Sequence, residues 1–184
     1  DFCAGAYRSL DMLETVQQHF LRQVRVELIA DRRAGPAGWA VFLQCGRSFL
    51  HRRWLSPGGR RPWHVIANFY DDTYNQADWA DVVLAQSLGT KFSAIHRLLE
   101  DRPGFLEQYD YILYLDDDVL ITEEAITRLF RLAETLQLQL AQPALTQDSV
   151  SAWEVLKQQS GSLGRYLNAV EIMMPLIKRE ALLA

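Results

Sequence analysis

Short apolar runs alternate with amphipathic stretches over most of the chain. Two amphipathic stretches predict helices: one begins after Thr90, and the other begins after Thr122 with two glutamates in its first turn. The apolar runs have the length of strands and are rich in β-branched and aromatic residues. They cover residues 39–43, 64–69, 82–85, 111–115 and 138–141. Strands that alternate with helices in this way predict an α/β fold with a mostly parallel sheet flanked by helices.

The N-terminal part of the chain has a different pattern. Apolar side chains recur at helical spacing over residues 10–29, and a loop-like segment with two glycines and a proline follows. We therefore expect an N-terminal helical extension over residues 1–38 and one α/β domain over residues 39–184. A further helix is expected from Lys178 onward. Because the chain ends inside this helix, we expect the sequence to be a fragment.

Composition narrows the classes of protein. The 184 residues are 49% hydrophobic and 23% charged, as in one globular domain, and a formal net charge of −4 argues against a general nucleic-acid binder. No apolar run approaches the roughly 20 residues of a transmembrane segment. No signal peptide is recognisable, so the cytoplasm is the default expectation. Cys3 and Cys45 are too few for a disulfide framework or a zinc site; we expect reduced thiols, with a single disulfide as the alternative.

Three consecutive aspartates, Asp116, Asp117 and Asp118, follow the most apolar predicted strand. Ligands of α/β sheets bind beyond the carboxyl ends of the strands. On extended backbone, Asp116 and Asp118 point to the same side and can share one ligand. Adjacent carboxylates repel one another, and Mn²⁺ or Mg²⁺ bound together with phosphate oxygens removes that conflict. We therefore predict a divalent metal on Asp116 and Asp118 that carries a diphosphate. A plain turn ahead of the helix at Thr122 is the alternative.

Two classes of enzyme place an Asp-x-Asp motif directly after an apolar strand: the GT-A glycosyltransferases and the haloacid-dehalogenase-like phosphatases. In the phosphatases the motif usually opens the domain, and a lysine and a second acidic pair follow it. Here a large α/β region precedes the motif, only Lys157 and Lys178 follow it, and no acidic pair comes after Glu124. The order favours a glycosyltransferase. A metal-dependent phosphatase and a non-catalytic nucleotide-sugar-fold binding module remain as alternatives.

An ordered series of short motifs runs through residues 39–184. Its members are Trp54, Asn-Phe-Tyr-Asp-Asp (68–72), Gly-Thr-Lys-Phe (89–92), Tyr-Asp-Tyr-Ile (109–112), the triple Asp (116–118), Ala-Gln-Pro-Ala-Leu (141–145) and Val-Glu-Ile-Met (170–173). The series resembles the family catalogued as domain of unknown function 707, which is grouped with GT-A glycosyltransferase folds.

The resemblance implies a GT-A-like (Rossmann-like) fold that binds a nucleotide-diphospho-sugar donor and a divalent metal. It also implies transfer of the sugar to an unknown carbohydrate or other hydroxyl acceptor. In the family further sequence follows the Val-Glu-Ile-Met segment, and GT-A enzymes often take a late histidine and an acidic base from such a region. We therefore expect the acceptor half to be incomplete and the catalytic base to lie outside this chain.

Further candidates for donor or acceptor binding lie near predicted strand ends. Asp71 and Asp72 follow one strand, where the resemblance implies contact with base or ribose and a turn is the alternative. Lys91 opens a helix and can face phosphate there, although a solvated lysine is the more ordinary interpretation. Asp117 lies beside the predicted metal.

Gln142 and Glu171 come after the acidic cluster. Glu171 is expected in an apolar strand over residues 169–177, where a lone carboxylate is costly unless it has a partner. We expect both residues to bind a donor or acceptor hydroxyl, with an ion pair from Glu171 to Arg165 as the alternative.

Four arginines, Arg52, Arg53, Arg60 and Arg61, flank a Pro-Gly-Gly segment at residues 57–59. They can grip a diphosphate or an anionic acceptor. A solvated loop is the favoured interpretation.

Overall fold

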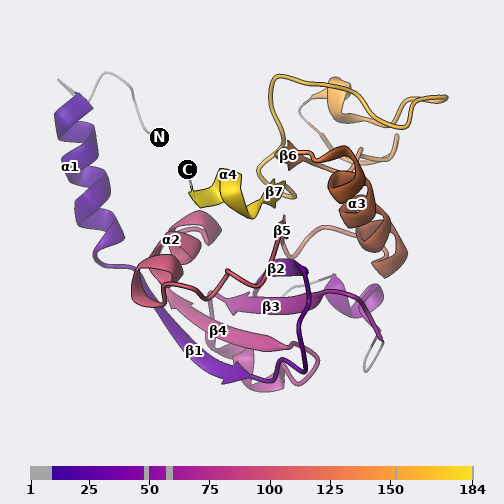
Figure 1. Cartoon of the computed structure of the whole chain (residues 1–184). Coiled ribbons are helices and arrows are strands. Elements are labelled where there is room, and N and C mark those ends of the chain that lie inside the picture. Colours follow the sequence, from indigo (N-terminus) through magenta and orange to yellow (C-terminus); the bar gives the residue numbers. More distant parts are fainter. Residues whose placement is uncertain (1–9, 48–49, 57–59, 152, 184) are drawn as a thin grey trace.

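The structure is a computed structural model that describes residues 10–183, apart from 48–49, 57–59 and 152. One sheet runs through it in the strand order β1–β4–β3–β2–β5–β7–β6, with α2 against one face and α3 against the other (Figure 1). The strands are β1 (Arg25–Asp31), β2 (Trp39–Cys45), β3 (His64–Phe69), β4 (Val82–Ser87), β5 (Tyr111–Leu115), β6 (Leu140–Ala141) and β7 (Leu176–Lys178). The helices are α1 (Leu10–Leu21), α2 (Lys91–Asp101), α3 (Glu123–Leu136) and α4 (Arg179–Leu183), with short 3-10 helices η1 (His51–Arg53), η2 (Asp72–Gln76) and η3 (Glu154–Leu156).

The centre of the sheet is parallel and its edges are antiparallel. β2 pairs in parallel with β3 and β5, and β3 pairs in parallel with β4. β1, β7 and β6 join in antiparallel pairs. The α/β prediction is confirmed, with a parallel centre inside a mixed sheet. The strands predicted over 64–69 and 111–115 match β3 and β5, β2 and β4 run slightly further than predicted, and the run at 138–141 shrinks to β6.

The two helices of the α/β region begin where their capping residues predict. Thr90 Oγ1 accepts a hydrogen bond from the backbone N–H of Ser93 at 3.4 Å, and Ser93 Oγ accepts one from the backbone N–H of Thr90 at 2.6 Å. At the start of α3, Thr122 Oγ1 accepts a hydrogen bond from the N–H of Ala125 at 3.1 Å. Both helix predictions are confirmed.

The predicted N-terminal helix is wrong in its second half. α1 ends at Leu21, and β1 pairs with β4 at the edge of the sheet. Val24 and Leu28 fit a helical period, but Val26 and Leu28 also fit the alternation of a strand. In the structure Val26 and Leu28 pack against the α2 face of the sheet. Pairing with β4 therefore decides the conformation, and the sheet already begins ahead of the predicted domain boundary at residue 38.

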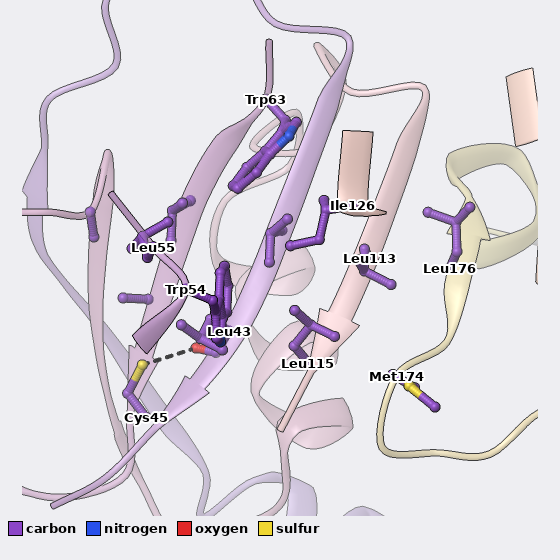
Figure 2. Packing of buried hydrophobic residues seen from close by; sticks show 14 of the residues in the cluster. Leu43, Cys45, Trp54, Leu55, Trp63, Leu113, Leu115, Ile126, Met174 and Leu176 are labelled. Atoms are coloured by element: carbon purple, nitrogen blue, oxygen red, sulfur yellow. Dashed lines mark hydrogen bonds between the residues drawn. The ribbon is translucent and has the colours of Figure 1, made fainter. Parts of the chain in front are cut away.

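Alternate residues of the central strands enter two separate cores. On the α3 face, side chains from β2, β3 and β5 pack with Trp54, Trp63 and Ile126 (Figure 2). On the α2 face they pack against Ile95 and Leu98. Strands that are covered on both faces are mostly apolar, which explains the continuous apolar sequence of β5.

Cys45 is a buried free thiol at the end of β2. Its Sγ donates a hydrogen bond to the carbonyl oxygen of Leu43 at 3.5 Å. Burial raises the pKa of the Cys45 thiol well above its ordinary value, and the nearby carboxylates of Asp117 and Asp71 add to the effect. The expected reduced state is confirmed for Cys45, whereas Cys3 lies outside the described residues.

The C-terminal part is mostly irregular before it returns to the sheet. In residues 142–175, the described positions form η3 and an isolated bridge between Leu145 and Lys157. β7 then pairs with β5, and α4 confirms the helix predicted near the end of the chain. Within the described part of the chain, no helix has both the length and the apolar character to cross a membrane.

Acid is expected to destabilise the fold through His51. This side chain is 1% exposed, and its ring lies 4.0 Å, between centroids, from that of Trp79. Burial, assisted by the charge of Arg52, lowers the His51 pKa from 6.5 to about 4. Between pH 6.5 and about 4, His51 is therefore protonated in the unfolded chain but stays neutral in the folded state. The free energy of unfolding should fall as pH drops from 6.5 towards 4, by up to about 1.4 kcal/mol per pH unit.

Urea unfolding at pH 7 and pH 5 measures this loss. His51→Phe keeps an aromatic ring against Trp79 but does not titrate, so the variant should lose less stability than the wild type over the same interval. An identical pH dependence of the two proteins would contradict the assignment to His51.

Candidate functional site

The carboxyl ends of the parallel strands meet at one edge of the sheet. β3 and β4 lie on one side of β2, and β5 lies on the other, so the strand order changes direction between β2 and β5. Ligands of open α/β sheets bind at such a switch point. A pocket of about 520 Å³ opens there. Its lining residues are Gln44, Tyr70, Leu88, Gly89, Thr90, Lys91, Phe92, Asp116 and Ile172.

An ion pair joins the two sides of this pocket. Lys91, the first residue of α2, is 8% exposed, and its Nζ donates a hydrogen bond to Asp116 Oδ1 at 2.6 Å. An ammonium group is buried at high cost unless it is paired, so Asp116 accounts for its position. The solvated interpretation of Lys91 is therefore wrong. The structure brings together the predicted phosphate residue and one predicted metal ligand.

Asp117 points to a different partner. Its Oδ2 accepts a hydrogen bond from the Tyr70 hydroxyl at 2.5 Å, and its carbonyl oxygen accepts one from the N–H of Leu50 at 2.7 Å. Burial raises the pKa of the Asp117 carboxyl, and the charges of Asp118 and Asp116 act in the same direction, whereas the bond from Tyr70 opposes them. Burial and the bond to Asp117 also raise the pKa of the Tyr70 hydroxyl. Asp117 therefore anchors Tyr70 across the end of β2.

The three aspartates do not lie on extended backbone. Asp117 and Asp118 form a turn, and the N–H of Val119 donates to the carbonyl oxygen of Asp116 at 3.4 Å. The expectation that Asp116 and Asp118 align as in a strand is wrong for this reason. Asp118 is exposed.

The metal prediction is not tested by this geometry. Among the described residues, no group of three or more His, Cys, Asp or Glu side chains could hold a metal ion. A site of two carboxylates is smaller than that, and Mg²⁺ typically takes one or two carboxylates and completes its shell with phosphate oxygens and water. Asp116 lines the pocket and fits such a role together with a diphosphate, whereas Asp118 is exposed and is not among the lining residues.

Asp71 and Asp72 act in local structure. Asp71 Oδ1 accepts hydrogen bonds from the N–H and the hydroxyl of Thr73 at 3.0 and 2.5 Å, so Asp71 caps η2. The carboxylate of Asp72 is exposed and lies 3.2 Å from a guanidinium nitrogen of Arg47. Neither aspartate is among the residues that line the pocket. Their contacts agree with the alternative of a turn.

Gln142 and Glu171 lie together near the pocket. Gln142 Oε1 accepts a hydrogen bond from the N–H of Glu171 at 2.5 Å, and Glu171 Oε1 accepts one from the N–H of Ile172 at 3.0 Å. The predicted strand around Glu171 is wrong: it lies in the irregular segment before β7 and is half-buried. The described side chain of Arg165 donates instead to the carbonyl oxygens of Val155 and Lys157, so the alternative ion pair is wrong as well.

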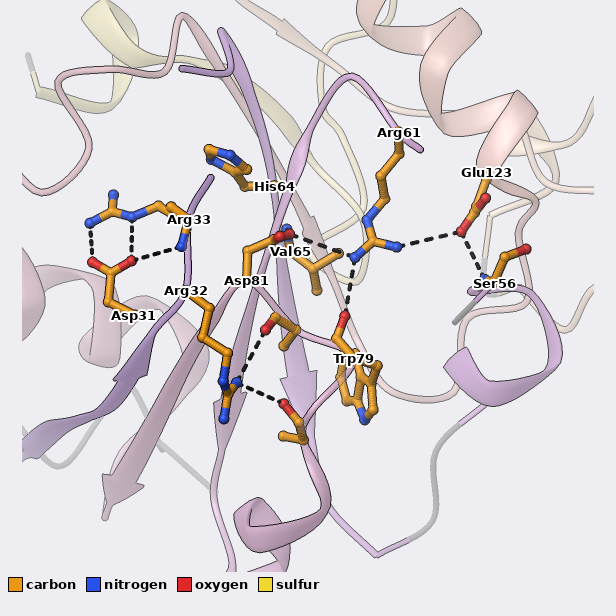
Figure 3. A network of polar contacts seen from close by, with 12 residues as sticks. Asp31, Arg32, Arg33, Ser56, Arg61, His64, Val65, Trp79, Asp81 and Glu123 are labelled. Carbon is orange, nitrogen blue, oxygen red and sulfur yellow. Dashed lines mark hydrogen bonds and ion pairs between the residues drawn. The ribbon is translucent and has the colours of Figure 1, made fainter. Parts of the chain in front are cut away.

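Arg61 has a structural role. Its guanidinium lies 3.6 Å from the carboxylate of Asp81 and 3.9 Å from that of Glu123, and it donates to the carbonyl oxygen of Trp79 at 3.1 Å (Figure 3). It is thus less solvated than expected. None of the four arginines is among the pocket-lining residues, and the segment at 57–59 lies outside the described residues.

Three side-chain amides that were not predicted from the sequence lie beneath the pocket. Gln44, Asn68 and Gln86 come from β2, β3 and β4, and their side chains are hydrogen-bonded to one another. Gln86 Nε2 also donates to the carbonyl oxygens of Leu88 and Thr90 at 2.7 and 3.0 Å. The available signal was a polar residue near the carboxyl end of each of three apolar strands.

The loop between β4 and α2 has an unusual backbone. Leu88 has a φ of +62° and Gly89 a φ of +86°, and leucine rarely adopts this left-handed conformation. A side chain at Gly89 would collide with Ser93. Strained backbone persists where surrounding contacts impose it and is concentrated at functional sites. Here the bonds from Gln86 supply those contacts and fix the start of α2.

No protein-family profile, no curated protein and no solved structure matches this chain.

Replacing Gly46 by alanine is expected to detach Tyr70 from Asp117. An alanine Cβ at Gly46 would overlap the Tyr70 ring, so the ring must move and its hydrogen bond is lost. We expect the free energy of unfolding to fall by about 1 kcal/mol, the net value of one hydrogen bond.

Chemical unfolding of Gly46→Ala, Tyr70→Leu and the double variant measures this coupling. The glycine substitution should cost much less when Tyr70 is already leucine. Equal costs in both backgrounds would show that Gly46 does not act through Tyr70.

Proposed function

We propose that the protein is a metal-dependent glycosyltransferase whose pocket binds the diphosphate of a nucleotide-sugar donor. The observation that carries this proposal is the ion pair of the buried Lys91 with the half-buried Asp116 at the switch point of the sheet. A lysine in the first turn of a helix suits phosphate, because the N–H groups of that turn lack intrahelical partners. A carboxylate beside it suits a divalent cation. A metal diphosphate needs both groups.

The charged groups have distinct parts in the proposal. Lys91 Nζ would bind a diphosphate oxygen. Asp116 and Asp118 would hold Mn²⁺ or Mg²⁺ together with diphosphate oxygens and water. When bound, the metal offsets the negative charge that develops on the departing nucleoside diphosphate. Asp117 keeps its bond to Tyr70 and positions this wall of the pocket.

An apolar rim surrounds the charged pair. Tyr70, Leu88, Phe92 and Ile172 line the pocket, and all four are exposed. Ligand sites typically combine apolar walls with a few polar groups that orient the ligand. Aromatic and aliphatic side chains at this rim suit the flat face of a nucleobase or the apolar face of a sugar ring.

The resemblance to the family catalogued as domain of unknown function 707 supports the same proposal. Lys91 and Asp116 belong to two of its motifs, are 25 positions apart in sequence and form one ion pair. The acceptor in this proposal is a carbohydrate or another hydroxyl compound, and Gln142 and Glu171, which adjoin the pocket residue Ile172, are its candidate contacts. The catalytic base is not assigned to a residue of this chain.

A metal-dependent phosphatase is the second candidate, and one observation favours it. Phosphatases that form an aspartyl-phosphate need a lysine beside the nucleophilic aspartate, and Lys91 lies 2.6 Å from Asp116. Here Lys91 precedes Asp116 in sequence, whereas in the phosphatases the lysine follows the nucleophilic aspartate. Asp116 also follows the fourth of the parallel strands along the chain. We therefore rank this function below glycosyl transfer.

Thermal unfolding with nucleoside diphosphates and their sugars tests the first proposal. With Mn²⁺ present, one nucleotide at 100 times its Kd should stabilise the protein by about 2.7 kcal/mol, which raises Tm by roughly 5–10 °C for a chain of this size. EDTA should abolish the shift. Asp116→Asn/Asp118→Asn should abolish it too, and Lys91→Met should reduce it strongly.

Glu107→Gln is the matched control, because it removes one carboxylate from the exposed loop between α2 and β5. This variant should retain the full shift. A shift of the same size in EDTA would overturn the metal-dependent proposal. Absence of a shift with every nucleotide would overturn donor binding by this chain and favour the non-catalytic module.

The phosphatase is tested by its covalent intermediate. After incubation with acetyl phosphate and Mg²⁺ and rapid acid quenching, mass spectrometry of peptides should find no phosphoryl group on Asp116 if the protein is a glycosyltransferase. Asp116→Asn supplies the background, because its amide cannot form the acyl phosphate. A phosphoryl group on Asp116 that is absent from this variant would reverse the ranking of the two functions.

A further inference from the structure

A ladder of three side-chain amides crosses the sheet below the pocket. Gln44 and Asn68 are register partners on β2 and β3, and Gln86 follows on β4. All three point to the α2 face. Asn68 and Gln86 are buried, whereas Gln44 is half-buried and lines the pocket. The ladder therefore connects the interior of the sheet to the pocket through Gln44.

The orientation of each amide in the ladder follows from the contacts of Gln86, whose amide can be placed in only one way. Gln86 bonds two backbone carbonyl oxygens, at 2.7 and 3.0 Å, and a carbonyl oxygen can only accept. The Gln86 nitrogen must therefore face the loop, and its Oε1 must face Asn68. Asn68 Nδ2 donates to this oxygen at 2.6 Å and to Gln44 Oε1 at 2.9 Å. The backbone of one loop thus fixes the direction of all three amides.

This orientation of the amides leaves one buried oxygen of Asn68 without a hydrogen bond in the described part of the chain. Both amide hydrogens of Asn68 are used, and its Oδ1 is buried without a hydrogen-bond partner among the described residues. An unpaired buried oxygen is unfavourable. The opposite orientation of Asn68 would face oxygen to oxygen at two places, so the observed orientation is the less costly one.

A count of hydrogens leaves one donor at the pocket. A glutamine nitrogen carries two hydrogens. Gln44 Nε2 uses one towards Gln86 Oε1 at 3.3 Å, and the described residues supply no acceptor for the other. Gln44 Oε1 already accepts from Asn68. The remaining N–H is the unused donor of the ladder, beside the unpaired acceptor Asn68 Oδ1, and it belongs to the residue that lines the pocket.

We propose that Gln44 is a specificity-determining residue that donates a hydrogen bond to an acceptor-only oxygen of the ligand. A phosphate oxygen and a nucleobase carbonyl oxygen share this chemistry. The ladder prevents Gln44 from rotating its amide to accommodate a ligand donor, because rotation would break its bonds to both neighbours. The pocket therefore selects for an acceptor at this position. The inference deepens the proposed function and rests on the same pocket as its ligand site.

The side-chain amide signals of the wild-type chain test this proposal by nuclear magnetic resonance. Gln44→Met and Gln86→Met identify the signals by their loss. Without ligand, one hydrogen of Gln44 should exchange with solvent much faster than the hydrogens of Asn68 and Gln86. Inorganic pyrophosphate and uridine, titrated separately, represent the phosphate and the carbonyl source. One of them should shift the faster hydrogen of Gln44 selectively.

Calorimetric titration of the probe that shifts this signal gives the energetic test. Gln44→Met should weaken binding about tenfold, the effect of one hydrogen bond. Gln44→Glu, which replaces the donor by an acceptor, should weaken it further. Gln139→Met, at an exposed glutamine outside the pocket, is the matched control and should bind as the wild type does.

The outcomes separate this inference from the proposed function. If pyrophosphate or uridine shifts the Gln44 signal but no nucleotide sugar gives metal-dependent stabilisation, Gln44 is a hydrogen-bond donor to the ligand and the transferase proposal fails. If a nucleotide sugar stabilises the protein and Gln44→Met binds it with unchanged affinity, the transferase proposal stands and the proposed hydrogen bond from Gln44 to the ligand is overturned. Failure of both probes to move the Gln44 signal, or slow exchange of both its hydrogens, would also overturn the donor role.

Discussion

Burial of the parallel strands on both faces governs the architecture of this protein. β2, β3, β4 and β5 have α3 or the η1 region over one face and α2 over the other. Such strands accept polar side chains at their ends, where the sheet meets solvent. Parallel direction then gathers the polar groups that follow each strand at one edge. The pocket with Lys91 and Asp116 is a consequence of this arrangement.

The polar groups at that edge are held by one another. Lys91 depends on Asp116, Asp117 holds Tyr70, and Gln86 holds the loop that presents Lys91. Buried polar groups are stable when their hydrogen bonds are satisfied, and each of these bonds joins different strands or loops. The edge is therefore a connected set of residues in which a change at one position alters its neighbours.

Local sequence patterns predicted the helices and strands well where a segment fits only one kind of element. Predominantly apolar runs identified β3 and β5, and the capping residues Thr90 and Thr122 identified the starts of α2 and α3. The pattern failed where two periods fit the same residues, as in β1. It also failed around Glu171, where apolar composition suggested a strand and the chain instead runs irregularly towards β7.

Periodicity, capping and strand direction can be recognised in the sequence, so the α/β class, the main elements and the edge of the sheet at which Asp116 lies were predictable without the structure. The ion pair of Lys91 with Asp116 and the place of Gln44 in an amide ladder emerged from the fold alone. Both depend on which strands become neighbours. The rest of helix α2 and all of strand β5 lie between Lys91 and Asp116 in the sequence, and no local sequence pattern predicts their contact.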